Sequence, residues 1–213
     1  MRFGRPCCTP SWVSSNSVNR KTLLVPVFRL DRPQHGDFME LVVEPQEGRG
    51  LRPWFYHLQG LGLEPAIQLA SQALQAVRAD GVEPLVYWTN PKLPLSQLAG
   101  VALALALSVW AADERCGFSE IISVGQLEVL AEEGLRITDT GCTGRSLAAV
   151  ASLGVRPRPA CLILPERPLL GQRETALLHA LEHYGIRCLQ VGSLESAAWA
   201  CRQDALEAGR MLA

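Results

Sequence analysis

A long uncharged stretch, Leu95–Ala111, constrains the fold of this chain more than any other feature. Alanine alternates with leucine through its middle, which lets a neighbouring helix or strand approach closely. A membrane-spanning helix needs about 20 consecutive apolar residues. This stretch is shorter, and it carries polar side chains at Ser96, Gln97 and Ser108. We therefore predict that it forms the central, fully covered helix of a soluble α/β domain.

The composition indicates one globular domain with a tail. Of the 213 residues, 48% are hydrophobic, which is enough for a sizeable core. The formal net charge of −1 predicts no general attraction to nucleic acid or to an acidic membrane surface. We assign residues 22–213 to a single domain and the basic, serine-rich residues 1–21 to a disordered tail. An organelle transit peptide stays open for this tail, because such peptides are also rich in Arg and Ser.

The cysteines indicate reduced thiols in a cytoplasmic protein. Their number is odd and no Cys-x-x-Cys pair occurs among Cys7, Cys8, Cys116, Cys142, Cys161, Cys188 and Cys201. Several of them lie inside apolar runs. This pattern is typical of buried thiols rather than of a disulfide framework or a zinc site. We expect neither a cofactor nor a structural metal.

Hydrophobic periodicity predicts alternating strands and helices along most of the chain. Short apolar runs bounded by turn residues predict strands over 23–30, 39–43, 54–58, 85–88, 121–124, 135–138, 161–164 and 186–191. Apolar spacings of three and four, together with the uncharged stretch, predict helices over 64–79, 95–111, 143–153, 172–184 and 193 to about 210. Thr143 and Ser193 are the predicted N-caps of two of these helices. Repeated strand–helix units imply helices packed on a mixed sheet.

The middle of the chain resembles the N-terminal domain of the magnesium-chelatase-like (ComM/YifB-type) bacterial ATPases. The resemblance is carried by FYHLQGL at 55–61, by Ser71 and VRADG at 77–81, and by the strand LVYWTN at 85–90. The second half is similar to the wider Lon protease family. Its matching segments are SVGQL at 123–127, GRSLAA at 144–149, LILP at 162–165 and SLESA at 193–197. The resemblance covers about residues 38–202 and implies a Lon-protease-like α/β (α+β) fold, related to ribosomal S5 domain 2.

The resemblance also implies that the Lon catalytic pair is missing. Lon proteases use a Ser nucleophile in a Pro-Ser-Ala-Gly segment and a Lys base on a later helix. The matching positions here are occupied by Leu98 and Ser146. Ser96 lies two residues early, and Arg145 is one residue off and stays protonated, so it cannot act as a base. The ComM-type domains lack the pair too, but this chain has no Gly-x-x-x-x-Gly-Lys-Ser/Thr segment and hence no ATPase of its own.

We therefore expect a non-catalytic, pseudoenzyme domain that binds a protein partner or associates with itself, since Lon-type domains commonly pack in rings. The resemblance suggests an ATPase as that partner. We expect no membrane partner. Two other classes stay open: a hydrolase with a displaced site at Ser96, Ser146 or a histidine pair, and a nucleic-acid-binding module, since the S5-like fold occurs in RNA-contacting proteins.

The histidine pair is His179 and His183, which fits His-x-x-Glu-His together with Glu182. Two histidines four residues apart on a helix share one face and can bind one metal ion. A zinc site also needs a further ligand, for which Glu195 and Glu207 are the downstream glutamates. Because the surrounding helix is polar, a solvated helix face is the preferred interpretation.

The loop before the helix at 143–153 carries two further patterns. Thr138-Asp139-Thr140-Gly141 resembles the Asp-Thr-Gly of aspartic proteases, which need two such loops and a different fold. The glycines of TGCTGRS at 140–146 leave free N–H groups at a helix start, where an anion can bind. A plain connection between strand and helix is the preferred interpretation of both.

Aromatic and basic residues offer two surface alternatives. We expect core packing for the tryptophans at Trp54, Trp88, Trp110 and Trp199, whereas exposed aromatic side chains would indicate a protein interface. We expect a solvated loop for the arginines at Arg156, Arg158, Arg167 and Arg173, with nucleic-acid contact as the alternative.

Overall fold

The computed structural model describes residues 20–28, 36–45, 55, 58, 62–77, 84–88, 99–112, 116–130, 134–155, 159–166 and 170–201. Within these ranges the chain has the mixed α/β fold that the sequence predicts. Most of the predicted tail, residues 1–19, lies outside the described residues. The first strand begins at Lys21, one residue before the predicted domain boundary.

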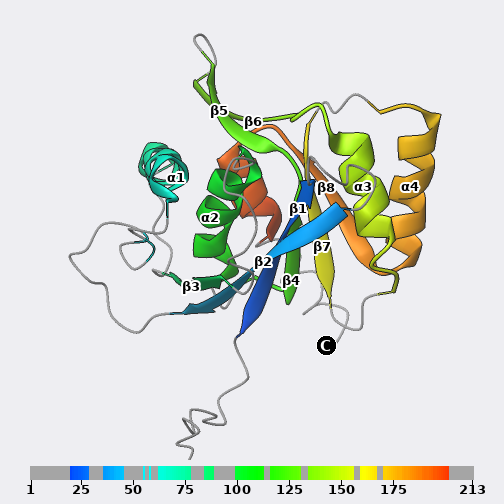
Figure 1. The fold of residues 1–213 in the computed structure, drawn as a ribbon, viewed down its shortest axis with the longest axis horizontal. Helices are drawn as coiled ribbons and strands as arrows, with labels where there is room; N and C mark the ends of the chain where they lie inside the picture. The colour runs from blue at the N-terminus through cyan, green and yellow to red at the C-terminus, as the bar shows by residue number, and fades with distance from the viewer. Residues whose placement is uncertain are drawn as a thin grey trace, which may run out of the picture.

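Six strands form one mixed sheet in the order β3–β2–β1–β4–β7–β8 (Figure 1). Their bounds are β1 Lys21–Phe28, β2 Gly36–Pro45, β3 Pro84–Trp88, β4 Glu120–Ser123, β7 Ala160–Pro165 and β8 Ile186–Val191. The first three strands are antiparallel, whereas β1, β4, β7 and β8 run parallel to one another. A separate antiparallel hairpin is formed by β5 (Gln126–Leu130) and β6 (Gly134–Thr138).

Helices cover both faces of the sheet (Figure 1). On one face lie α1 (Glu64–Ala76), α2 (Ala99–Ala111) and a final helical segment at 194–201, and on the other lie α3 (Thr143–Ala151) and α4 (Gln172–His183). Side chains alternate between the faces as strand geometry requires. On β1, for example, Leu23 and Val25 pack toward α2, and Leu24 between them packs toward α3 and α4.

The prediction of a central buried helix is confirmed. Every residue of α2 from Val101 to Ala111 is buried. The sheet covers one side of this helix, and α1 and strand β5 pack against its other sides. Its hydroxyl at Ser108 donates to the backbone oxygen of Leu105 at 2.6 Å, so the one polar side chain of the buried segment is satisfied within the helix. No helix in the described ranges is long and apolar enough to cross a membrane.

The prediction of a strand over 54–58 is wrong at both positions that the structure describes. Phe55 lies in a turn and Leu58 in a single 3₁₀ turn, closed by a hydrogen bond from Leu58 N–H to Phe55 O at 2.9 Å. Both side chains are nevertheless buried. The apolar run therefore reflects burial of a turn, which short hydrophobic segments do not distinguish from a strand.

Two other local predictions differ from the structure. Strand β5 has no counterpart among the predicted elements, because Glu128 and Val129 are both exposed and break the alternation of apolar and polar residues. Thr143 is the first residue of α3 rather than its N-cap, and its hydroxyl donates to Asp139 Oδ1 at 2.5 Å. The N-cap predicted at Ser193 is confirmed, since its Oγ accepts the N–H of Ser196 at 3.1 Å.

Candidate functional site at the carboxyl edge of the parallel strands

Open α/β sheets bind ligands at the carboxyl ends of their parallel strands, so this edge is the first place to look for a site. Here the edge includes the ends of β4, β7 and β8, and the first turn of α2 lies next to it. A Cβ atom at Gly100 would stand 3.0 Å from Val25 Cγ1 and 3.3 Å from the backbone oxygen of Gly125. Glycine at position 100 therefore lets the helix approach the end of β4 closely.

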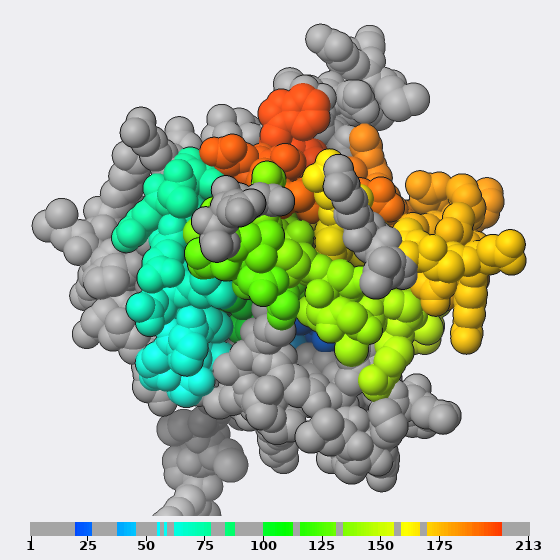
Figure 2. Space-filling model, turned by 90° about the horizontal axis from the view of Figure 1, so that it is seen from above, coloured from blue at the N-terminus to red at the C-terminus, as the bar shows by residue number. Residues whose placement is uncertain are grey.

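The β5–β6 hairpin closes this edge. Ile137 of β6 donates its N–H to the carbonyl of Gly192, just beyond β8, at 3.1 Å. Gly125 begins the hairpin at a φ of +117°, and a Cβ there would lie 3.0 Å from Thr138 O and 3.1 Å from Pro165 Cγ. Seen from above, the green segments around the hairpin and the lime α3 lie between α1 and α4 (Figure 2). The hairpin therefore occupies the position at which a doubly wound enzyme holds its ligand.

One buried hydroxyl beneath this edge has no hydrogen-bond partner. Ser123, the last residue of β4, is 1% exposed, and its Oγ is unpaired. It pairs with Ile163 on β7 and shares the α2 face of the sheet with Ile121. A buried serine can act as a nucleophile only with a base beside it. The buried polar residues in the described ranges are all hydroxyl-bearing: Ser108, Ser123, Thr143 and Ser146.

Of the two positions that the resemblance assigns to a Lon pair, the structure describes one. Leu98 and Ser96 lie outside the described residues, so the structure does not place them relative to Ser146. Ser146 itself is 5% exposed on the buried side of α3. Arg145, beside it, is exposed. Since α2 and α3 pack on opposite faces of the sheet, only their amino-terminal ends, at the carboxyl edge, could approach each other.

The glycine-containing start of α3 is occupied by carboxylates of the chain itself. Asp139 Oδ1 accepts the N–H of Gly141 at 2.9 Å in addition to the hydroxyl of Thr143. From α4, the side chain of Glu174 packs against Gly144, where an added Cβ would stand 2.7 Å from Oε1. These carboxylates supply the negative charge that a helix amino terminus favours. The arrangement therefore supports a structural connection into α3 rather than a phosphate-binding site.

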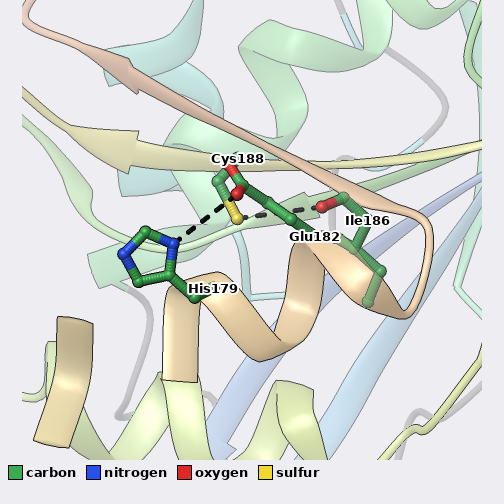
Figure 3. A network of polar contacts seen from close by, with 4 residues as sticks. All are labelled: His179, Glu182, Ile186 and Cys188. Carbon is green, nitrogen blue, oxygen red and sulfur yellow. Dashed lines mark hydrogen bonds and ion pairs between the residues drawn. The ribbon is translucent and has the colours of Figure 1, made fainter. Parts of the chain in front are cut away.

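The histidines of α4 lie on an exposed surface, and Figure 3 shows His179 beside Glu182. His179 Nδ1 is 3.9 Å from Glu182 Oε2, with side chains 73% and 58% exposed, and His183 is also exposed. In the described ranges, no group of three or more His, Cys, Asp or Glu side chains is arranged to hold a metal ion. His179 and His183 therefore lie on an exposed helix face, and Glu207, one of the two glutamates named as a further ligand, lies outside the described residues.

Cys188 on β8 lies near Glu182 of α4, and its thiol donates to the backbone oxygen of Ile186 at 3.8 Å (Figure 3). Burial, and then the charge of Glu182, raise the pKa of Cys188 from its ordinary value of 9.0 to about 11. A catalytic cysteine needs a lowered pKa, which a neighbouring cation or imidazolium provides. In the Cys188–Glu182–His179 arrangement, the carboxylate and not the imidazole is next to the sulfur. This order does not support nucleophilic catalysis by Cys188.

Sequence reasoning correctly predicted the burial of one tryptophan and missed the exposure of another. Trp110 is 3% exposed in α2, whereas Trp199 on the final helical segment is 61% exposed. The side chains of Trp54 and Trp88 lie outside the described residues. The signal that could have identified Trp199 is its position in SLESAAWA, where Leu194, Ala197, Ala198 and Cys201 form the buried face. Of the four arginines of the predicted basic loop, the structure describes Arg173, which is exposed on α4.

Neither protein-family models nor curated protein sequences show a significant match to this chain.

Proposed function

We propose that this protein is a non-catalytic, Lon-like domain that works by protein association, with a second copy of itself as the first partner to test. The exposed indole of Trp199 is the observation that carries this proposal. Tryptophan is enriched at the centres of protein interfaces, where one such side chain often contributes a large share of the binding energy. A side chain of this size that is 61% exposed on a helix has little structural reason to remain there.

Two features support the non-catalytic part of the proposal. The hairpin covers the sheet edge at which an α/β enzyme would bind its substrate, through the bond from Ile137 N–H to Gly192 O. Moreover, the polar residues that are buried as a whole in the described ranges are Ser108, Ser123, Thr143 and Ser146, without a Lys or His among them to act as base. The resemblance of the sequence to Lon-type domains, together with the α/β architecture, supports the Lon-like assignment.

Sedimentation velocity over a wide range of protein concentration tests the proposal. We expect the wild-type chain to associate and Trp199→Ala to weaken the association by at least about 2 kcal/mol, close to thirtyfold in the dissociation constant. Val155→Ala is the matched control, because Val155 is also strongly exposed, at 72%, but lies after α3 on the other face of the sheet. A wild-type chain that stays monomeric throughout, or equal weakening by both variants, contradicts self-association through Trp199.

A further inference from the structure

Three cysteines from distant parts of the sequence meet in the core on the α2 face of the sheet. Cys116 precedes β4, Cys161 is on β7, and Cys201 is the last described residue of the final helical segment. They are 4%, 0% and 0% exposed, and all three are free thiols within one hydrophobic cluster. The cluster thus brings Cys116 and Cys161, which lie in or beside the sheet, next to Cys201 on the helix.

Hydrogen bonds connect the three thiols in a chain. Side-chain hydrogen-bond contacts join Cys201 to both Cys116 and Cys161. The thiol of Cys116 also donates to the backbone oxygen of Phe118 at 3.8 Å. Cys201 therefore lies between two potential partners. Lys21 is next to the same cluster, since its Nζ donates to the backbone oxygen of Cys116 at 2.5 Å.

The folded core keeps these thiols protonated. The hydrogen-bond contact with Cys201, and then burial, raise the pKa of Cys116. For Cys201, the contact with Cys116 lowers the pKa, but the contact with Cys161 and burial outweigh it. The charge of Lys21 acts in the opposite direction and favours both thiolates. An opening of the helix end would admit water and remove the desolvation, while the charge of Lys21, at the start of β1, would stay in place.

We propose that Cys116 and Cys201 are a thiol pair that peroxides convert to an intramolecular disulfide, which ties the final helix to the sheet. The Cys116 thiolate attacks a peroxide oxygen, the O–O bond breaks, and a sulfenic acid and water are formed. The Cys201 thiolate then attacks the sulfenic sulfur, the S–S bond forms, and a second water leaves. Two thiols lose two electrons and two protons, and one hydrogen peroxide is reduced to two waters.

Backbone freedom favours Cys116 over Cys161 as the partner of Cys201. Cys161 is fixed in the middle of the sheet, paired with Ile121 on one side and Arg187 on the other. Cys116 lies outside the strands, followed by the exposed Gly117, so its backbone can adjust to the short sulfur–sulfur distance of a disulfide. Cys116 is also the one of the three residues with a small exposed fraction, 4%.

Peptide mapping of the wild-type chain after treatment with hydrogen peroxide tests the proposal without any substitution. Unpaired thiols are alkylated, the protein is digested without reduction, and mass spectrometry identifies the linked peptides. We expect a Cys116–Cys201 linkage that dithiothreitol removes, and a higher unfolding temperature for the oxidised chain. Cys161→Ala should keep the linkage and Cys201→Ala should abolish it. Lys21→Gln should slow its formation severalfold, and Lys21→Arg should restore much of the rate.

Three outcomes overturn the proposal. One is complete alkylation of both thiols after peroxide treatment under conditions that oxidise a small-molecule thiol fully. Another is a Cys161–Cys201 linkage in place of the expected one. The third is over-oxidation of Cys116 to a sulfinic acid without any linkage. Each is read from the wild-type protein, so a variant that fails to fold leaves the test intact. Peptide mapping reads the linkage and sedimentation reads self-association through Trp199, so the failure of one proposal is distinguishable from the failure of the other.

Discussion

Glu174 on α4 lies against Gly144 on α3, close enough that a methyl group added to the glycine would meet Glu174 Oε1 at 2.7 Å. The other oxygen of the same carboxylate, Oε2, accepts the N–H of Gly171 at the start of α4 at 3.0 Å. One side chain thus caps its own helix while it packs on the first turn of the neighbouring one. The two helices that cover this face of the sheet are joined at their amino-terminal ends.

This relationship predicts a coupling between the two positions. Glycine to alanine in a helix normally stabilises by about 1 kcal/mol. In the wild-type chain, Gly144→Ala displaces the Glu174 carboxylate from the Gly171 N–H. We expect the loss of this hydrogen bond to cancel the stability gained from the alanine. In a Glu174→Ala background the same change should stabilise by about 1 kcal/mol. Urea denaturation of the four proteins of this cycle measures the coupling, and strictly additive effects would show that the contact has no energetic weight.

The unpaired hydroxyl of Ser123 predicts a stabilising substitution. A buried polar group without a partner costs about 1–3 kcal/mol, so Ser123→Ala should raise the free energy of unfolding by about 1 kcal/mol. The control is Thr143→Val, which removes a hydroxyl of similar burial whose bond to Asp139 is made. That change should destabilise by about 1.5 kcal/mol. Chemical denaturation compares them, and a loss of stability in Ser123→Ala would mean that the hydroxyl contributes in the native state.

The closure of the sheet edge by the hairpin predicts a large effect at Gly125. Gly125→Ala combines a φ of +117° with backbone contact to Thr138 O, and should destabilise by about 3 kcal/mol or more. Gly134 in the same hairpin also has a positive φ, +71°, but open space around it. Gly134→Ala should therefore cost only about 1 kcal/mol. Thermal unfolding of both variants checks this, and equal costs would exclude a role for the contact at Gly125.

The sequence was sufficient for the parts of the fold that depend on local pattern. The strand predicted over 186–191 coincides with β8, and the helix over 172–184 with α4 to within one residue. Both have strong periodicity and a glycine, Gly185, with φ +78° between them. The order of the strands in the sheet could not be obtained in this way. It depends on contacts between residues far apart, such as Leu23 with Ile121.

The candidate site was less predictable for a related reason. The exposed position of the α4 histidines and the exposure of Trp199 depend on which side of each helix the rest of the chain covers. The thiol chain of Cys116, Cys201 and Cys161 joins three segments whose spacing in the sequence carries no pattern. Likewise, Ser123 has the local features of an ordinary strand residue, and nothing in its sequence context marks its hydroxyl as unpaired.

Cys188 predicts a pH dependence of stability at the β8 edge. Burial, followed by Glu182, raises the pKa of its thiol to about 11 in the folded chain, against an ordinary value of 9.0 that applies when the chain is unfolded. Below pH 9.0 the thiol is protonated in both states, and its contribution to stability is fully present. As the pH rises toward 11, the unfolded state loses the proton first, so this contribution is lost.

Across this interval we expect the unfolding free energy of the wild type to fall relative to that of Cys188→Ala. Urea unfolding at a series of pH values measures the difference, in which the titration of other groups cancels. The variant Glu182→Gln, which removes the nearby charge, should reduce the shift, and a difference that stays constant through the interval would contradict the assignment.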